Sequence, residues 1–281
     1  MILGNKYVMS YQELEEEYYT LIKKENGIYY YELKNSFTFV IPYNFKEYNE
    51  YEKTIFDYQN KIYQTLFSKD DNLFEELSPE VKLNDVKVNE EDYFYPVGDN
   101  NSLEFEMEIK DRKAIYLNVD HTYGNFYNIT VNGKIIKNPV LTDKQNTKFP
   151  VSEQKLLYLG TYEDEKITVT MYTEGIEIKK FLIGMMNVEK YKELSNNTFK
   201  SSVELTNNSL EISLDNTSYD ALFIPINYLD NYIITNNNEY VGYSKNINNY
   251  ISIELKEGEN NITIKYDTPY ILTGTIIFSF F

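Results

Sequence analysis

Past Pro79, apolar and polar residues alternate along much of the chain, as they do in strands that bury one face of a sheet. The runs with this period of two are Leu103/Phe105/Met107/Ile109, Ile115/Leu117/Val119, Ile167/Val169/Met171, Leu210/Ile212/Leu214, Ile251/Ile253/Leu255 and Ile262/Ile264/Tyr266. Asn132-Gly133 lies between two further apolar runs and predicts a β-hairpin, because these residues accept the positive φ of a tight turn. Strands at short intervals without helices between them favour antiparallel sandwiches.

The first 83 residues follow a different pattern. Apolar residues three or four positions apart predict a helix over 48–67, namely Tyr51, Ile55, Tyr58, Ile62 and Leu66. Ser10 and Glu13 have the spacing of a capping box and predict a short helix after Ser10. Asn26-Gly27 predicts a hairpin between strands near residues 18–22 and 27–33.

We therefore predict a mainly β protein in which two consecutive antiparallel β-sandwich domains follow a small α+β unit with one longer helix. The α+β unit is expected at 1–83, the first sandwich at 84–190 and the second at 191–281. Asn187 is a suitable N-cap for a short helix near 187–194, which marks the boundary between the two sandwiches.

Composition excludes several classes of function. The 281-residue chain has a formal net charge of −17 and a sequence pI near 4.6, so it would repel nucleic-acid phosphates. It has no cysteine, which excludes disulfides, thiolate nucleophiles, zinc–thiolate sites and iron–sulfur clusters. We expect no nucleic-acid partner and no cofactor.

No residue pattern points to catalysis. His121 is the single histidine, and a lone histidine after a strand is best interpreted as a loop or core-edge residue. Acidic runs such as Glu163-Asp164-Glu165 are typical of solvated turns, although a two-carboxylate hydrolase is a third hypothesis. Asp215-Asn216 could offer oxygens to calcium, but turn chemistry explains the pair more simply. We predict no catalytic residue and no metal site.

One aromatic cluster is a candidate for binding a sugar ring. Tyr123, Phe126 and Tyr127 follow a predicted strand and lie close to Asp120 and Asn128. Aromatic faces beside amide and carboxylate groups can stack on carbohydrate and hydrogen-bond to it. The alternative, that these rings pack the core or its rim, is favoured by the number of aromatic residues that the cores need.

Several segments resemble, in the same order, those of a known family of bacterial proteins. The segments are Leu3-Gly4 with Lys6-Tyr7-Val8 and Ser10, Asn26 to Glu32, Phe56 to Lys61, Leu73 to Leu77, Ile129 to Lys134, Leu222 to Tyr228, and Leu255 to Tyr266. Together they resemble the soluble region of the bacterial membrane protein YfhO family from one end of the chain to the other.

The resemblance implies a non-catalytic region on the extracytoplasmic face of the bacterial cell membrane. The parent protein would be a membrane glycosyltransferase that uses lipid-linked sugars to decorate cell-wall polymers such as teichoic acids, with its catalytic residues in the membrane portion. That membrane portion is the expected partner, and a cell-wall glycopolymer or glycan is a second. The alternative is a free-standing carbohydrate-binding protein made of two sandwiches.

The final segment, Ile271 to Phe281, is apolar and uncharged. The resemblance implies a truncated membrane helix there, whereas the pattern alone equally allows a closing strand of the second sandwich. No segment reaches the roughly 20 apolar residues that a membrane span requires. If the family interpretation is right, we expect Met1 and Phe281 to emerge on the same side of the folded region.

Overall fold

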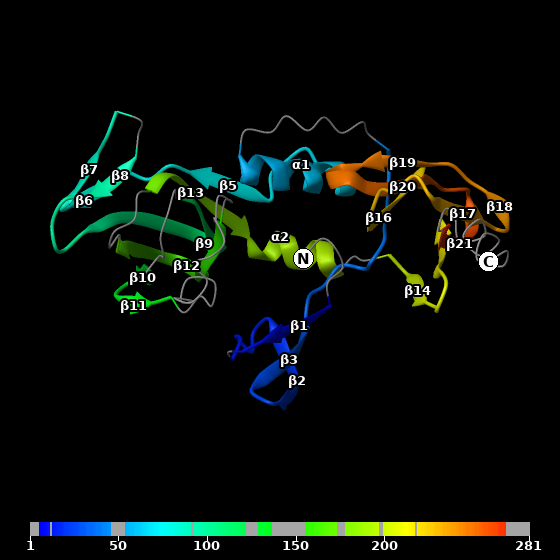
Figure 1. Cartoon of the computed structure of the whole chain (residues 1–281), viewed down its shortest axis with the longest axis horizontal. Helices are drawn as coiled ribbons and strands as arrows, with labels where there is room; N and C mark the ends of the chain where they lie inside the picture. The colour runs from blue at the N-terminus through cyan, green and yellow to red at the C-terminus, as the bar shows by residue number, and fades with distance from the viewer. Residues whose placement is uncertain are drawn as a thin grey trace, which may run out of the picture. The chain divides into compact units, whose positions relative to one another are not determined.

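The computed structural model describes residues 6–11, 13–45, 54–90, 93–121, 129–136, 155–172, 178–196, 199–216 and 218–267 (Figure 1). These residues form antiparallel sheets and two α-helices, which confirms the predicted mainly β class. The chain divides into two compact units, one from residues 1–51, 61–71 and 194–281 and the other from 52–60 and 72–193. The division at residues 83 and 190 stays a prediction, and Met1 and Phe281 lie outside the described residues.

The unit that contains residues 72–193 is built on a nine-stranded sheet in which β9 pairs with β12 along almost its whole length. Its strands are β5 (Phe74–Leu77), β6 (Lys82–Asn84), β7 (Val86–Val88), β8 (Phe94–Pro96), β9 (Ser102–His121), β10 (Ile129–Val131), β11 (Lys134–Ile135), β12 (Lys155–Tyr172) and β13 (Ile178–Asn187). The Asn132-Gly133 hairpin between β10 and β11 is confirmed.

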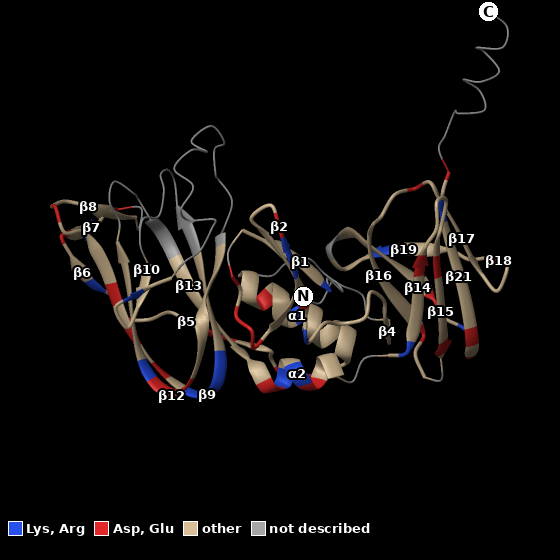
Figure 2. Ribbon diagram, turned by 90° about the horizontal axis from the view of Figure 1, so that it is seen from below, with Lys and Arg blue, Asp and Glu red and all other residues tan. Residues whose placement is uncertain are grey.

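Both long strands of this sheet have an irregularity near their middle. Asp111 in β9 and Asp164 in β12 have φ values of 56° and 48°, and the Asp111 N–H donates to Asp164 Oδ1 at 3.1 Å. The register also shifts between Glu163 and Glu165. Bulges of this kind bend a sheet, and Figure 2 shows the charged residues gathered where β9 and β12 turn.

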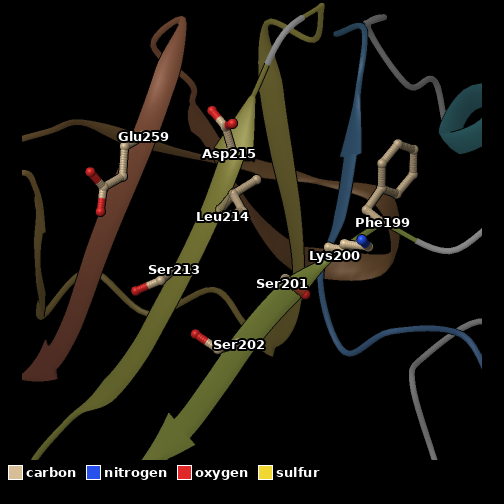
Figure 3. A pocket seen from close by; sticks show the side chains of 8 residues that line it. All are labelled: Phe199, Lys200, Ser201, Ser202, Ser213, Leu214, Asp215 and Glu259. Carbon is tan, nitrogen blue, oxygen red and sulfur yellow. The ribbon is translucent and has the colours of Figure 1, made fainter.

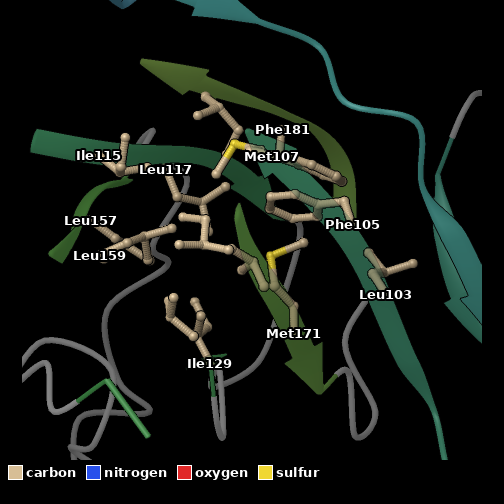
Figure 4. Packing of buried hydrophobic residues seen from close by; sticks show 14 of the residues in the cluster. Leu103, Phe105, Met107, Ile115, Leu117, Ile129, Leu157, Leu159, Met171 and Phe181 are labelled. Carbon is tan, nitrogen blue, oxygen red and sulfur yellow. The ribbon is translucent and has the colours of Figure 1, made fainter. Parts of the chain in front are cut away.

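The two halves of the bent sheet share one core (Figure 4). The cluster of buried residues takes Leu103, Phe105, Met107 and Ile109 from the first half of β9 and Ile115 and Leu117 from its second half. The predicted runs at 103–109 and 115–119 are therefore parts of one strand. Because residues of both halves belong to one buried cluster, the sheet lines the same core on both sides of the bend.

Helix α1 (Ile55–Phe67) lies within the predicted 48–67 and is capped by Thr54, whose Oγ1 accepts a hydrogen bond from the Asp57 N–H at 3.0 Å. Residues 48–53 lie outside the described residues. In the first half of the helix, the buried Asn60 accepts from the Leu73 and Phe74 N–H groups at 3.0 and 2.8 Å and donates to the Phe74 carbonyl at 2.9 Å. One amide side chain thereby fixes the start of β5.

Helix α2 (Val188–Asn196) has the predicted N-cap. The Asn187 side-chain oxygen accepts from the Lys190 N–H at 2.9 Å. In the described part of the chain, neither α1 nor α2 has the length and apolar character that crossing a membrane demands.

In the other unit, a five-stranded and a four-stranded sheet contribute to one apolar core, as expected of a sandwich. The five-stranded sheet contains β14 (Ser201–Leu205), β15 (Leu210–Asn216), β17 (Tyr232–Asn236), β18 (Glu239–Tyr240) and β21 (Gly258–Tyr266). The four-stranded sheet contains β4 (Ile41–Tyr43), β16 (Ala221–Asn227), β19 (Tyr243–Asn246) and β20 (Tyr250–Glu254), with the short 3-10 helix η1 (Ile247–Asn249) between the last two.

Strand β4 joins this sandwich from far away in the sequence. It pairs with β16, and the fully buried Tyr43 hydroxyl forms a hydrogen bond of 2.8 Å with Ser252 Oγ across 209 positions of sequence. The Asn246 amide also donates to this hydroxyl. Burial raises the pKa of Tyr43 above its ordinary value, so the hydroxyl keeps its proton in the core.

Residues before β4 form a separate three-stranded sheet in the order β1-β3-β2. Its strands are β1 (Tyr7–Ser10), β2 (Tyr19–Glu25) and β3 (Ile28–Leu33), and the predicted hairpin at Asn26-Gly27 joins β2 and β3. The predicted helix after Ser10 is wrong. Ser10 pairs with Tyr29 in the sheet, and the Leu14 N–H donates to the Tyr31 hydroxyl, so the apparent capping box does not start a helix.

A prediction concerns the contact of Gly184 in β13 with Phe56 of α1. A Cβ at position 184 would overlap the Phe56 ring, so Gly184→Ala should lower the free energy of unfolding by roughly 1–3 kcal/mol, as other overpacked sites do. Urea unfolding measures the effect.

The control is Gly242→Ala, where a Cβ would meet nothing within 4 Å, and little change is expected there. Adding Phe56→Leu to Gly184→Ala should recover part of the loss. If the losses of unfolding free energy from the two substitutions simply add in the double variant, the contact between Gly184 and Phe56 is not the cause of the destabilisation.

Candidate functional site

The residues predicted to stack on sugar, Tyr123, Phe126 and Tyr127, lie outside the described residues, so that site stays a prediction. His121 is the last residue of β9, and its backbone pairs with Ile178. The structure instead shows a depression on the five-stranded sheet, which is the candidate site.

The depression has a volume of about 720 Å³ and lies over β14, β15 and the start of β21 (Figure 3). Its lining residues are Phe199, Lys200, Ser201, Ser202, Ser213, Leu214, Asp215 and Glu259. Most of these side chains are polar, and Lys200 is the one cation of the lining.

Strand register decides which side chains face the depression. Ser202 lies directly opposite Ser213, and Asp215 lies directly opposite Glu259. Along β15 the alternate residues Ile212 and Leu214 are buried in the sandwich core, so Ser213 between them and Asp215 after Leu214 point outward. The outer face of the sheet therefore presents hydroxyl and carboxylate groups side by side.

The pair of Asp215 and Glu259 is electrostatically unfavourable. Like charges directly opposite each other destabilise an antiparallel pair. Within the part of the chain that the structure describes, no ion pair reaches either carboxylate, although Glu259 Oε1 accepts from the Asn261 amide at 3.0 Å. A ligand that donates hydrogen bonds here would relieve some of this repulsion.

Two further groups line one end of the depression. Ser201 Oγ is shielded from solvent and makes no hydrogen bond to another described residue. The ring of Phe199 meets the Tyr219 ring edge to face at 5.0 Å between centroids, which holds it at the rim. Hydroxyls, carboxylates and one aromatic ring are groups that can bind a polyol or a sugar.

The arrangement does not resemble a hydrolytic dyad. A general-acid carboxyl is usually shielded by apolar neighbours, whereas Asp215 and Glu259 are both exposed on an open face. In the described segments, no group of three or more His, Cys, Asp and Glu residues is placed to hold a metal ion.

Asn216 illustrates the turn chemistry expected of Asp215-Asn216. Its buried amide donates to the carbonyls of Tyr219 at 2.7 Å and Lys256 at 3.0 Å, and its oxygen accepts from the Tyr219 N–H at 3.0 Å. The side chain is occupied by the turn that it stabilises.

Sequence reasoning missed the depression. The alternation of Glu211, Ser213 and Asp215 with apolar residues indicates which side chains point outward. It does not indicate that Glu259 is the cross-strand neighbour of Asp215, because pairing between distant strands is not encoded locally.

Comparison with known proteins gives one family. The family model described as bacterial membrane protein YfhO matches residues 1–278. No curated protein matches the sequence.

Two solved structures show distant likeness. A Paenibacillus sp. cycloisomaltooligosaccharide glucanotransferase is 8% identical with a TM-score of 0.28, over 67% of this chain and 45% of that one. An Eisenbergiella tayi GH2 beta-galacturonidase is 9% identical with a TM-score of 0.22, over 62% of this chain and 31% of that one. The chain thus spans less than half the length of either, and neither likeness is close enough to carry an argument.

The like-charge pair gives a prediction. Glu259→Gln removes the repulsion with Asp215 and keeps an oxygen for the Asn261 amide, so it should raise the free energy of unfolding by about 0.2–1 kcal/mol at low salt. The gain should fall in about 1 M salt, where screening is strong.

The matched control is Glu104→Gln, because Glu104 lies opposite Lys82 and forms an ion pair of 3.2 Å with it. This change should leave stability unchanged or reduce it slightly. A loss of stability in Glu259→Gln would contradict the prediction.

Proposed function

The chain belongs to the bacterial membrane protein YfhO family, and we propose that it is the extracytoplasmic, non-catalytic region of a membrane glycosyltransferase that decorates cell-wall polymers such as teichoic acids. The family match over residues 1–278 carries the proposal, because it covers both compact units. The sugar transfer in this proposal rests on what the resemblance of the sequence motifs implies. The membrane portion of the parent protein is the proposed partner.

The depression on β14, β15 and β21 supports a role in contacting the acceptor. Ser202 and Ser213 offer hydroxyl groups that both donate and accept hydrogen bonds, and Asp215 and Glu259 accept them from sugar or polyol hydroxyls. The proposed region would hold or orient an acceptor chain while the reaction occurs elsewhere. The exposure of both carboxylates is consistent with binding and does not favour proton transfer.

The same depression also favours the second candidate, a free-standing carbohydrate-binding protein built of sandwiches. The extent of the reading frame in the gene distinguishes the two functions. A reading frame that contains membrane helices next to this region agrees with the first proposal, and a frame limited to these residues agrees with the second.

The proposed location gives a prediction for the full-length parent protein. Because the chain has no cysteine, Leu205→Cys introduces a thiol at a position where the native side chain is 81% exposed. With cysteines outside this region replaced by serine, a membrane-impermeant maleimide should label this thiol on intact protoplasts.

Leu222→Cys is the matched control, because Leu222 is fully buried in the sandwich core and should react only after denaturation. Labelling of Leu205→Cys that requires lysis of the protoplasts would place the region in the cytoplasm.

Contact with the acceptor gives a separate prediction. On an array of neutral oligosaccharides and polyols, the isolated chain should retain at least one ligand, and Asp215→Ala should weaken that binding by roughly tenfold, the effect of losing about 1.4 kcal/mol. Glu106→Ala is the control, because this exposed carboxylate pairs with Lys166 and belongs to the other compact unit. Equal loss in both variants, or no retained ligand, would refute acceptor contact at this site and leave the labelling result unaffected.

A further inference from the structure

The three-stranded sheet of β1, β2 and β3 has two different faces. Residues that lie directly opposite each other in an antiparallel pair share a face. Tyr7 lies opposite Glu32 and Met9 opposite Tyr30, so these four side chains belong to one face. Val8, opposite Tyr31, belongs to the other.

The face that carries Tyr31 is buried along the central strand β3, whereas Leu21 of β2, directly opposite Tyr31, is 51% exposed. Tyr31 and Leu33 are only 4% and 7% exposed, and the Tyr31 hydroxyl accepts from the Leu14 N–H at 3.0 Å. The rings of Tyr19 and Tyr29 lie 5.9 and 6.1 Å from the Tyr31 ring. This side of the sheet forms the small core on which its stability depends.

The face that carries Tyr7 and Met9 is open to solvent. These side chains are 65% and 71% exposed, although strands normally bury residues of this kind. Ile22, which lies at the bulge in β2 next to Lys23, is 53% exposed. Neighbouring exposed apolar groups on one small sheet are typical of an interaction surface.

Lysine side chains border this open face. The Lys6 ammonium lies 5.6 Å from the centre of the Tyr7 ring and pairs with Glu32 at 2.8 Å. The Lys23 ammonium lies 4.6 Å from the centre of the Tyr30 ring. Figure 2 shows basic residues on this sheet in a chain whose net charge is −17.

We propose that the open face of this sheet, with Tyr7 and Met9 on the edge strand β1 and Lys6 and Lys23 at its border, docks in the interface of a lipid bilayer. Tyrosine rings favour the level of the lipid headgroups, and a methionine side chain can enter the first part of the acyl region. Lysine stems extend along apolar surface while their ammonium groups reach the lipid phosphates.

The observations favour lipid over a sugar. Sugar binding needs a free aromatic face, but the Lys23 ammonium already lies over Tyr30, and Met9 is not a stacking group. Because the chain belongs to a family of membrane proteins, its parent protein is anchored in a bilayer, and a bilayer surface is within reach of this region. The proposal rests on that membership and not on the sugar transfer, so each can fail without the other.

The chain lacks tryptophan, so a single substitution creates a site-specific optical probe. Tyr7→Trp in the 281-residue chain should show a blue shift of emission on addition of phosphatidylcholine vesicles, and quenching when the lipid is brominated. Zwitterionic lipid is the informative choice, because the acidic chain as a whole would be repelled by an anionic surface.

Tyr240→Trp is the matched control, since Tyr240 is 82% exposed on β18, outside this sheet, and should show neither change. In the Tyr7→Trp background, Met9→Ser should weaken the quenching response roughly tenfold in lipid concentration, as expected for the loss of one inserted apolar side chain. Because Met9 is exposed, thermal unfolding should be nearly the same with and without this change.

Three results would overturn the proposal. One is the absence of a blue shift and quenching at position 7, and another is an equal response at position 240. The third is a blue shift that depends on protein concentration without vesicles, which would identify a second copy of the chain as the occupant.

Discussion

An antiparallel sheet that is apolar on one side must remove that side from water. The sheets of this molecule do so in different ways, and these ways determine the architecture of each part. The long strands β9 and β12 bend at Asp111 and Asp164, and one sheet then covers itself. The C-terminal sandwich stacks two separate sheets around a shared core. The small sheet of β1, β2 and β3 buries Tyr31 and Leu33 on one face and leaves Tyr7 and Met9 in solvent on the other.

Polar side chains in the interior have a second, more local role. Asn60 satisfies three backbone groups at the start of β5, and Asn216 does the same for the turn after β15. An amide carries both donors and an acceptor, so one buried asparagine can replace the partners that irregular backbone lacks. A mainly β chain has many turns and strand ends with backbone groups that need partners, and its many asparagines can supply those partners.

The local features of the fold could be predicted from the sequence, and the long-range ones could not. Periods of two, the Asn132-Gly133 turn and the Asn187 cap are encoded by neighbouring residues, and the structure has all of them. The sequence pattern does not show that 103–109 and 115–119 form one strand, because the bend depends on the positive φ of Asp111 and Asp164. It gives the outward position of Asp215 but not its pairing with Glu259. The Ser10 capping box failed because pairing with Tyr29 outweighed a local preference.

The pairing of β4 with β16 has a consequence for the order in which the protein can fold. The residues between these strands include the whole of the other unit, whose segments are nested within the sequence of the sandwich. During synthesis the inner unit can close while β4 still lacks its partner, and the sandwich is complete only once β16 and β20 have emerged. Until then the apolar side chains of Val40 and Ile41 remain uncovered, and this short segment is exposed to pairing with a neighbouring molecule.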